Sequence, residues 1–289
     1  MNKKQILFII NPHSGLGKHK QVLSLIEKYL DHKKFDFAIQ VTKKPGHATR
    51  LVKQNLNKFS IFCAVGGDGT VNEVGCTLIN TKKLLAIIPT GSGNGYATYL
   101  KIPTNTKKAI QAINRLKTKA VDTGYANNKP FLAFCGIGLD ALVAQDFSLR
   151  KLRGFFPYAY FFLKRFFQYR AKTYTLTFNR KNRKIQAFWI FIAHSGQYAK
   201  NVYLAPKARI DDGKLDIVII KHFKFYKIVK FALKTVTKQL DQSRYIETYQ
   251  IKHLQIEAKD MPFHLDGEPQ KNTSKLEINI KSKSLNLIL

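Results

Sequence analysis

The stretch AVGGDGTVNEV, residues 64–74, places three glycines and one aspartate between two apolar segments. The segment 61–65 has the length and composition of a buried strand, and 70–80 has the spacing of a helix. Glycine allows positive φ angles and lets the backbone approach a ligand closely. The amides of such a loop, and of the helix that follows it, can bind an anion. The stretch therefore predicts a strand, a phosphate-binding turn and the start of a helix.

The same alternation of strand and helix extends over about the first 125 residues. Strands are predicted at 6–10, 35–42, 61–65 and 84–89, and helices at 20–30, 47–56, 70–80 and 105–118. Apolar strands separated by helices indicate a parallel sheet that is covered on both faces.

The pattern changes after about residue 125, where most of the signals are those of strands. Two strands are predicted within 172–193, and others at 214–220, 251–258, 275–280 and 285–289. This half is therefore predicted to be an antiparallel β domain. The expected fold class is α/β followed by β, with domains at 1–125 and 126–289; the C-terminal residues could pack back on the first domain.

Two more glycine-rich turns follow predicted strands of the parallel sheet, NPHSGLGK at 11–18 and PTGSGNG at 89–95. In an open α/β sheet the carboxyl ends of the strands share one edge, and ligands bind there. Side chains that could bind phosphate at this edge are the hydroxyls of Ser14, Thr70 and Ser92 and the ammonium group of Lys18. Any one of these loops could be a simple tight turn, but three at one edge favour a ligand site.

Asp68 is the unusual member of this predicted site. Neither Gly-x4-Gly-Lys-Ser/Thr nor a Gly-x-Gly-x-x-Gly after the first strand is present, so the site is not one of the common nucleotide fingerprints. Phosphate repels a carboxylate unless that carboxylate holds Mg²⁺ or accepts a proton from a nucleophile. Both roles belong to phosphoryl transfer.

Taken together, these motifs resemble the catalytic domain of the diacylglycerol kinase and sphingosine kinase family, in particular bacterial soluble lipid kinases. GGDGTVNEV (66–74) is the most specific element, and NPHSGLGK and PTGSGN flank it in the family's order. HLDGEP (264–269) resembles the family's Asp-Gly-Glu motif, and ARIDDGKLDIVII (208–220) resembles its metal loop. The resemblance covers essentially the whole chain. It implies a three-layer N-terminal domain similar to those of NAD kinases and phosphofructokinases. It also implies a C-terminal β-sandwich domain that binds the lipid and contributes to the catalytic cleft.

The resemblance also implies ATP and Mg²⁺ as cofactors, and it suggests which residues bind the nucleotide. The implied contacts are Asn11, Pro12, His13, Ser14, Gly15, Thr42, Gly66, Gly67, Asp68, Gly69, Thr70, Val71, Asn72, Ser92 and Asn94. Glu268 matches the family's proposed proton acceptor, and Asp68 is the other candidate base. Asp122 matches an acidic position in a network around Mg²⁺.

A second metal site is implied for the loop RIDDGKLD. Asp212 would bind through its carboxylate, and Arg209 and Lys214 through their carbonyl oxygens, a ligand set that suits a hard cation. The alternative is that Asp211, Asp212 and Gly213 form only a turn into the next strand.

The sequence departs from the family pattern at one position that bears on the substrate. Many bacterial relatives carry Asn-Asp after the third glycine motif, whereas this chain has Asn94 and Gly95, which is closer to sphingosine kinases. Asp140 falls where sphingosine kinases place an aspartate that binds the lipid headgroup. The alternative for Asp140 is an exposed residue at the start of a helix. Both diacylglycerol and a sphingoid-like lipid therefore stay open as substrates.

The charge of the chain indicates a polyanionic partner. Its 289 residues contain 49 Lys and Arg against 18 Asp and Glu, a formal net charge of +31. No nucleic-acid-binding motif is apparent. The charge could attract nucleotide phosphates or an anionic membrane. For a lipid kinase, which the resemblance implies, an anionic membrane surface is the expected partner. The segment 224–240 would place apolar residues on one helical side and lysines on another. It could be an interfacial helix on anionic lipid, or a helix packed on the β domain with a solvated lysine face.

The expected function is that of an ATP-dependent lipid kinase that is cytoplasmic and peripherally bound to the membrane. Its three cysteines fit no zinc spacing and are interpreted as free thiols, and no run of about 18 apolar residues occurs. The family resemblance also suggests a homodimer. The alternatives are an NAD kinase-like enzyme, or a catalytically weak relative that binds lipid or nucleotide. NAD kinases carry an Asn-Glu pair well downstream, but the Asn-Glu pair here is Asn72-Glu73, inside the glycine motif.

Overall fold

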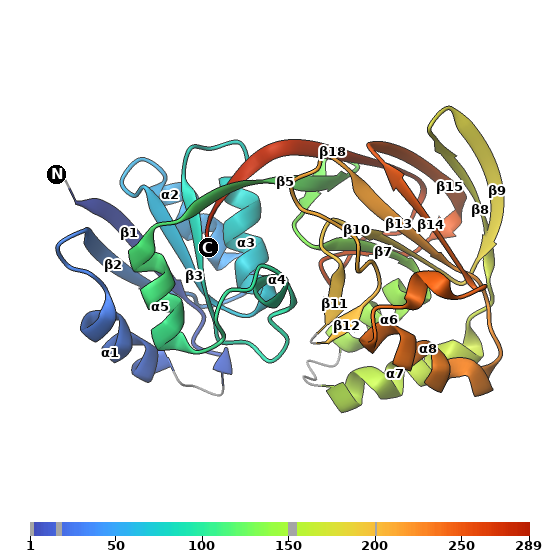
Figure 1. Cartoon of the computed structure of the whole chain (residues 1–289), viewed down its shortest axis with the longest axis horizontal. Helices are drawn as coiled ribbons and strands as arrows, with labels where there is room; N and C mark the ends of the chain where they lie inside the picture. Colours follow the sequence, from blue (N-terminus) through green and yellow to red (C-terminus); the bar gives the residue numbers. More distant parts are fainter. Residues whose placement is uncertain (1–2, 16–18, 150–154, 200) are drawn as a thin grey trace. The chain divides into compact units, whose positions relative to one another are not determined.

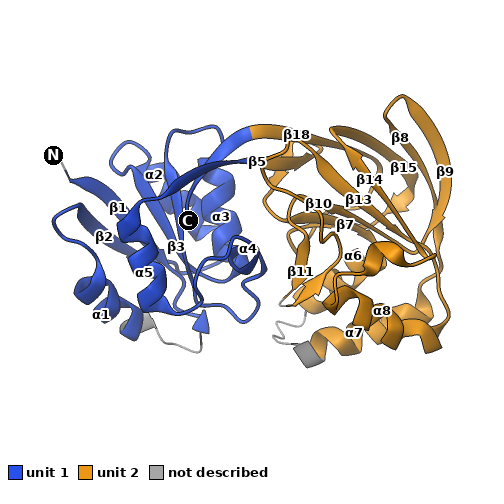
Figure 2. Cartoon of the chain, viewed as in Figure 1, with its two compact units in different colours: residues 1–121, 283–289 blue, residues 122–282 orange. Residues whose placement is uncertain are grey.

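The computed structural model describes residues 3–15, 19–149, 155–199 and 201–289 (Figure 1). The chain forms two compact units (Figure 2). Unit 1 comprises residues 1–121 together with 283–289, and unit 2 comprises residues 122–282. Among the described residues, no helix is both long enough and apolar enough to cross a membrane.

Unit 1 contains a parallel sheet with helices. Its strands are β1 (Lys4–Ile10), β2 (Phe35–Val41), β3 (Ile61–Gly66), β4 (Leu84–Pro89) and the last part of β18 (Thr273–Ile288). Its helices are α1 (His19–Tyr29), α2 (His47–Asn55), α3 (Asp68–Leu78), α4 (Gly95–Tyr99) and α5 (Thr106–Arg115). The strand order is β2-β1-β3-β4-β18, and every neighbouring pair is parallel. The predicted parallel sheet is confirmed, while the short helix α4 was not predicted.

Alternation along β1 explains why this sheet has helices on both faces. Ile6, Phe8 and Ile10 belong to a buried cluster that also contains residues of α1 and α5. Leu7 and Ile9 are equally buried and point to the opposite face, because successive side chains of a strand alternate. The helix α3 packs against α2 and against β3 and β4. A strand buried on both faces reads as a continuous apolar run, which is the pattern that the sequence has.

Unit 2 is a β-sandwich, as predicted. One antiparallel sheet is built from β7 (Phe134–Gly138), β10 (Trp189–Ala193), β13 (Leu215–Ile220), β14 (Ile246–Ile251), β16 (Phe263–Leu265) and β17 (Glu268–Pro269). The other contains β8 (Lys172–Phe178), β9 (Lys181–Ala187), β15 (His253–Met261) and the first part of β18, with β5 (Thr118–Ala126) and β6 (Lys129–Phe131) beside it. A single core cluster takes side chains from both sheets, such as Ile192 and Ile217 from one and Leu176 and Ile256 from the other.

Helices cover the outer face of the first of these sheets. They are α6 (Leu139–Leu149), α7 (Phe155–Gln168), the 3-10 turn η2 (Phe225–Lys227), α8 (Ile228–Val236) and the 3-10 turn η3 (Leu240–Gln242). Trp189, Phe191 and Val218 lie on this outer face and pack with Phe161 and Phe166 of α7. A pair of short strands, β11 (Gln197–Ala199) and β12 (Val202–Tyr203), lies in the same unit.

The strands β5 and β14 were not predicted, and two parts of the predicted strand pattern differ from the structure. The region 172–193 contains three strands, because the chain turns at Asn179 and Arg180 and then changes sheets at Phe188. The segments 275–280 and 285–289 form one long strand, β18. Its polar middle section is exposed, so polar residues there do not interrupt the strand.

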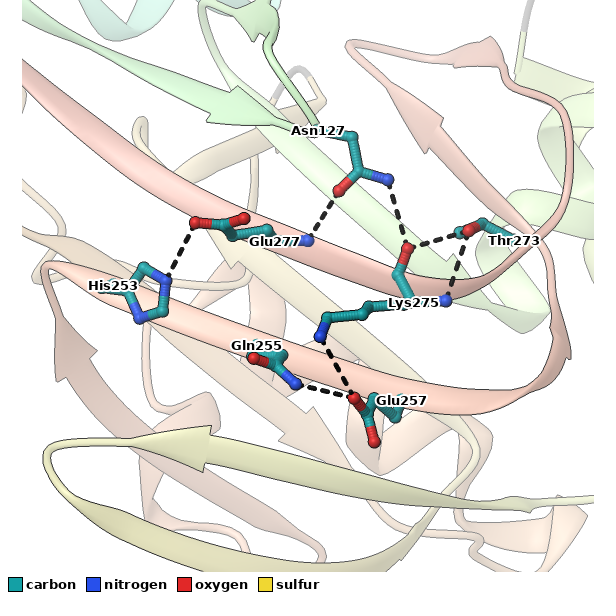
Figure 3. Close-up of polar contacts among 7 residues, drawn as sticks. All are labelled: Asn127, His253, Gln255, Glu257, Thr273, Lys275 and Glu277. Atoms are coloured by element: carbon teal, nitrogen blue, oxygen red, sulfur yellow. Dashed lines mark hydrogen bonds and ion pairs between the residues drawn. The ribbon is translucent and has the colours of Figure 1, made fainter.

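A polar network on β15 and β18 fastens the β5–β6 hairpin to the sandwich (Figure 3). Asn127, at the hairpin turn, has a φ of +45°; it donates through Nδ2 to the Lys275 carbonyl (3.1 Å) and accepts the Glu277 amide (2.8 Å). On the same strands, His253 contacts Glu277 at 3.2 Å and Lys275 contacts Glu257 at 3.6 Å. Glu257 and Lys275 lie directly opposite each other on β15 and β18, and an opposite-charge pair at such a position supports the register.

Candidate active site

The strand order of unit 1 determines where a ligand should bind. From β1 the chain moves to β2 on one side, and from β3 it moves to β4 on the other side. The order therefore reverses between β1 and β3, and the crevice at the carboxyl ends of such strands is the usual ligand site of an open α/β sheet. The loops 11–15 and 90–94 follow β1 and β4 at this edge, and the turn 66–68 joins the end of β3 to the start of α3.

Direct hydrogen bonds hold these three glycine-rich loops together. Asn11 donates through Nδ2 to the hydroxyl of Thr70 at 3.2 Å. The hydroxyls of Ser14 and Thr90 lie 2.8 Å apart, and the Thr90 amide donates to the Gly66 carbonyl at 2.9 Å. The loops thus form one connected surface and are fixed before any ligand arrives.

Several of the glycines are required by this packing. A Cβ on Gly91 would lie 2.5 Å from the Cα of Gly67, and one on Gly66 would lie 2.4 Å from the Thr70 hydroxyl. Gly15 has a φ of +68°, and its Cβ would lie 2.8 Å from the Thr90 carbonyl oxygen. Gly69 differs, since a Cβ there would meet no protein atom within 4 Å. The space beside Gly69, in the first turn of α3, is therefore open to a ligand.

Asp68, in the second of these turns, accepts hydrogen bonds from the segment that follows the third loop. Its Oδ2 accepts the amide of Gly95 and its Oδ1 accepts that of Tyr96, both at 3.2 Å. Asn94, in the left-handed conformation, closes the third loop by accepting the Gly91 amide (2.9 Å) and donating to the Gly91 carbonyl (2.7 Å). The carboxylate of Asp68 is therefore oriented by backbone amides at the first turn of α4.

The surroundings of Asp68 fit Mg²⁺ bound together with a nucleotide. Each carboxylate oxygen accepts one amide in the contacts above and has further lone-pair capacity. Within the described parts of the chain, no group of three or more His, Cys, Asp or Glu could enclose a metal. Mg²⁺ in kinases needs no such enclosure, because one or two carboxylates, phosphate oxygens and water complete its shell. Asp68 can supply the protein ligand of such a site.

The other predicted nucleotide contacts lie at or near the same edge. Thr42, which follows β2, donates its amide to the Ile10 carbonyl at 2.8 Å. Ser14 and Thr70 are buried, whereas His13 and Ser92 are exposed. Pro12 and Asn72 are half-buried, and Val71 is buried in the first turns of α3. Lys18 lies outside the described residues.

Glu73, in the most specific motif, has a role that the sequence analysis missed. Its carboxylate accepts the amides of Gly46 at 2.8 Å and Ala48 at 2.9 Å, at the start of α2. The residue before α2, Gly46, has no side chain to cap this helix. Glu73 therefore joins α3 to α2. An uncapped helix start was the signal that could have suggested such a partner.

Unit 2 presents Glu268 on a rigid hairpin. The turn between β16 and β17 is formed by Asp266 and Gly267, with φ angles of +50° and +85°. The Asp266 carboxylate accepts three consecutive amides, those of Leu132 (2.7 Å), Ala133 (2.8 Å) and Phe134 (2.9 Å). Glu268 follows this anchored turn and is exposed. Its exposure leaves it accessible to a substrate.

Asp140 is not at the surface. It begins α6 but is 1% exposed, and it accepts hydrogen bonds from Tyr158 (3.0 Å), Tyr198 (2.5 Å) and Nε2 of His264 (2.6 Å). Burial, followed by the charge of Asp140, raises the pKa of both tyrosines. The structure thus places Asp140 inside unit 2, where its carboxylate orders other side chains, and the alternative of an exposed helix-start aspartate does not describe it.

The cluster of Asp140, Tyr158, Tyr198 and His264 leads to the turn before Glu268. Nδ1 of His264 accepts the Gly267 amide at 3.1 Å. An imidazole nitrogen that accepts a hydrogen bond carries no proton, so Nε2 is the protonated nitrogen that donates to Asp140. Asp140 therefore fixes His264, and His264 fixes the turn. A lone aspartate in the apolar run CGIGLDALV was the sequence signal for a buried and paired carboxylate.

Asp122 and the loop 209–214 form another connected group in unit 2. The Oδ2 of Asp122 accepts the Gly213 amide at 2.7 Å, and Oδ1 of Asp212 accepts the Lys214 amide at 3.1 Å. Arg209 pairs with Asp211 at 3.4 Å. These bonds are those of a closed turn held against β5. They orient the Asp212 carboxylate, and a second metal bound there remains a prediction.

Comparisons with known proteins agree with this arrangement. Residues 5–126 match the family described as the diacylglycerol kinase catalytic domain, and residues 133–289 match the YegS C-terminal NAD kinase beta sandwich-like domain. The chain therefore carries a match to the diacylglycerol kinase catalytic domain and belongs to the family of proteins with the YegS-type C-terminal domain. Family membership assigns it to the lipid kinases, as the sequence resemblance implied.

Individual relatives cover most of the chain. It is 28% identical to a probable lipid kinase YegS-like of Chromohalobacter salexigens, over 80% of this chain and 77% of that protein. It is 25% identical to a diacylglycerol kinase of Bacillus subtilis, over 92% and 90% of the two chains. The crystal structure of a candidate diacylglycerol kinase from Bacillus anthracis has a TM-score of 0.80 and 25% identity, covering 100% and 98%.

The predicted fold likeness to NAD kinases is also confirmed. Yeast NADH kinase has a TM-score of 0.54 and 10% identity, covering 99% of this chain and 83% of its own. At that identity the likeness concerns the fold.

Proposed function

We propose that this protein transfers the γ-phosphoryl group of ATP to a hydroxyl group of a membrane lipid, either a diacylglycerol or a sphingoid-like lipid. The observation that carries the proposal is the convergence of three bonded glycine loops around Asp68 at the switch point of a parallel sheet. Relatives named diacylglycerol kinase support the lipid class. A peripheral association with an anionic membrane agrees with the net charge of +31.

In this mechanism the loops position the phosphates, and a carboxylate accepts a proton. The amides beside Gly69 and the hydroxyls of Ser14 and Thr70 hold the phosphate oxygens. Asp68 would hold Mg²⁺, and the cation would neutralise part of the phosphate charge when bound. As the lipid oxygen attacks the γ-phosphorus, its proton passes to Glu268 or Asp68, and ADP leaves with the bridging oxygen. Positioning and charge neutralisation supply most of the rate enhancement in reactions of this type.

The direct test is transfer of radiolabelled γ-phosphate from ATP to diacylglycerol, sphingoid base, ceramide, undecaprenol and NAD in parallel reactions. We expect label in one of the lipids and none in NAD. Asp68→Asn should lower kcat by at least a hundredfold without a change in thermal midpoint, on the order of the loss of one strong transition-state interaction. Label in NAD alone would contradict the proposal, as would lipid turnover by Asp68→Asn at the wild-type rate.

Two more features belong to the proposal and have their own tests. Asp122 and Asp212 would order the loop 209–214 and allow it to bind a divalent cation with the carbonyls of Arg209 and Lys214. Isothermal titration with Mg²⁺ in the absence of nucleotide measures that site, and Asp212→Ala should abolish the heat. The proposed homodimer is tested by light scattering, which gives the mass in solution.

A further inference from the structure

The exposed large apolar side chains of unit 2 gather on α7, η2 and α8. Among the described residues of the whole chain, eight such side chains lie on these elements and one, Val41, lies elsewhere. The eight are Tyr160, Leu163, Phe167, Phe225, Tyr226, Val229, Leu233 and Val236. Scattered apolar residues need no explanation, but a contiguous exposed set indicates an interaction surface. We call this set the apolar stripe.

The helix α8 has two apolar sides, and only one of them is packed. Ile228 and Phe231 pack against the helical cluster on the sheet. Val229 is 66% exposed and Leu233 is 60% exposed. With Tyr226 they have spacings of three and four residues, which place them on one side of the helix. The sequence analysis left open whether the apolar side of the segment 224–240 packs on the β domain. In the structure, several apolar residues of this segment remain in solvent.

The helix α7 continues the stripe. Tyr160, Leu163 and Phe167 also have spacings of three and four residues, and Phe167 is 67% exposed. The rings of Phe167 and Phe225 lie 4.7 Å apart, which connects α7 to η2. Arg165, which stands between Leu163 and Phe167 in the sequence, forms a bidentate pair with Asp146 of α6 at 2.6 and 2.7 Å. This pair fixes the rotation of α7 and thus the direction of its exposed side.

Cations accompany the stripe, and acidic residues do not. Neither 155–170 nor 222–240 contains an aspartate or glutamate. Lys164, Lys224 and Lys230 are exposed, and none of them forms an ion pair within the described parts of the chain. Lys227 is different, because it donates to the hydroxyl of Tyr245 at 2.5 Å and so helps to fasten the helix.

We propose that the apolar stripe and its lysines dock this protein on an anionic lipid bilayer. Aromatic and aliphatic side chains at the interface, with lysines beside them, are the composition of a peripheral membrane helix. The ammonium groups would contact anionic headgroups while Val229, Leu233 and Phe167 enter the boundary with the acyl chains. A second copy of the chain fits less well, because it would bring lysines against lysines. The inference rests on the proposed function, and it assigns the membrane contact to particular elements.

The test is flotation with vesicles of phosphatidylcholine alone and of phosphatidylcholine with phosphatidylglycerol in equal parts, without ATP or lipid substrate. We expect binding to the anionic vesicles only. Val229→Ser with Leu233→Ser should lower the partition coefficient at least tenfold. Lys164→Gln, Lys224→Gln and Lys230→Gln together should lower it on the order of a hundredfold, since each cation near such a surface contributes about 1 kcal/mol.

Matched controls separate this surface from general charge. Val41→Ser removes the exposed apolar side chain outside the stripe, and Lys181→Gln, Lys184→Gln and Lys252→Gln remove three exposed lysines of unit 2. Both controls should bind almost as the wild type does. Equal losses in the control and stripe variants would overturn the proposal. Light scattering that shows a dimer for the wild type and a monomer for the serine variant would also overturn it, by assigning the stripe to a second copy.

Activity on a dispersed short-chain diacylglycerol distinguishes this inference from the proposed function. The stripe variants should phosphorylate such a substrate at the wild-type rate, because no docking is needed. A wild type that binds anionic vesicles but phosphorylates no lipid would contradict the function and leave the docking surface supported. A wild type that phosphorylates lipid but does not bind anionic vesicles would overturn the docking surface.

Discussion

A buried carboxylate is tolerated only when donors surround it, and Asp140 has three. The chain of contacts from Asp140 through His264 to Gly267 ends one residue before Glu268. Asp140 and Glu268, which the sequence resemblance gave as candidate site residues, therefore differ in their surroundings. One orders the interior of unit 2, and the other is exposed on the turn that this interior supports.

Alanine substitutions of these two carboxylates should affect different quantities, the stability of the fold in one case and the catalytic rate in the other. Asp140→Ala leaves the buried His264 and two tyrosine hydroxyls without their acceptor, so we expect the free energy of unfolding to fall by about 3 kcal/mol. Glu268→Ala should leave that free energy within about 0.5 kcal/mol of the wild type while lowering kcat. Urea unfolding and steady-state kinetics measure the two quantities. An Asp140→Ala protein of wild-type stability would contradict the role assigned to the cluster.

His194 should make the stability of unit 2 depend on pH. It is fully buried, with Nδ1 donating to the Leu132 carbonyl at 2.7 Å, and burial lowers its pKa despite the opposing effects of Asp122 and Asp266. Below a pH of about 6.5, His194 binds a proton in the unfolded chain, whereas burial keeps it neutral in the folded chain. The contribution of His194 to the free energy of unfolding is therefore fully present above that pH and is lost as the pH falls.

We expect the urea midpoint to drop between pH 6.5 and pH 5, and His194→Asn to flatten part of that slope. Asparagine retains a donor near the position of Nδ1 but does not titrate. The matched control is His253→Asn, a half-exposed histidine on β15. An equal flattening by both variants would show that His194 is not the source.

At the scale of elements, the sequence determined the type and order of structure in unit 1 because strands buried on both faces give unbroken apolar runs. It also located the three loops, since glycine marks them. It did not show that Gly67 and Gly91 are needed for loop-to-loop packing, because that contact joins segments more than twenty residues apart in the chain. For the same reason it missed the capping of α2 by Glu73 and the burial of Asp140.

Alanine at two of the loop glycines separates packing from ligand contact. Gly91→Ala places a Cβ 2.5 Å from the Gly67 Cα, so the loops must move apart, and both stability and nucleotide affinity should fall. Gly69→Ala meets no protein atom and replaces glycine in a helix, so stability should rise by up to about 1 kcal/mol. If the ATP phosphates lie beside Gly69, affinity should nevertheless fall. Thermal unfolding and titration with an ATP analogue measure these effects, and unchanged affinity in Gly69→Ala would remove that residue from the nucleotide site.

At the scale of the whole molecule, the first unit is completed by the C-terminal segment. Residues 283–289 belong to unit 1, where β18 pairs with β4 through Asn286 and Leu287. The sequence predicted strands there, and it left open which unit they would join, because an apolar strand fits any sheet edge.

Loss of this segment should therefore affect the nucleotide unit. Leu287 is fully buried, and Leu287→Ala should lower the free energy of unfolding by about 3 kcal/mol. Removal of residues 283–289 should expose the edge of β4 and abolish nucleotide binding. The comparison is Leu163→Ala, an exposed leucine of α7, which should leave stability and nucleotide binding unchanged. A truncated protein with wild-type nucleotide affinity would contradict the structural role of β18.

The pairing of β4 with β18 also sets an order of events in folding. It joins Leu84 to Asn286, about two hundred positions away, and contacts of such long range raise the contact order and slow folding. The four strands β1 to β4 are local to one another, but their sheet gains its fifth strand only when a distant part of the chain arrives. Until then β4 is an open edge that can pair with another molecule. The refolding yield should accordingly decrease as the protein concentration is raised.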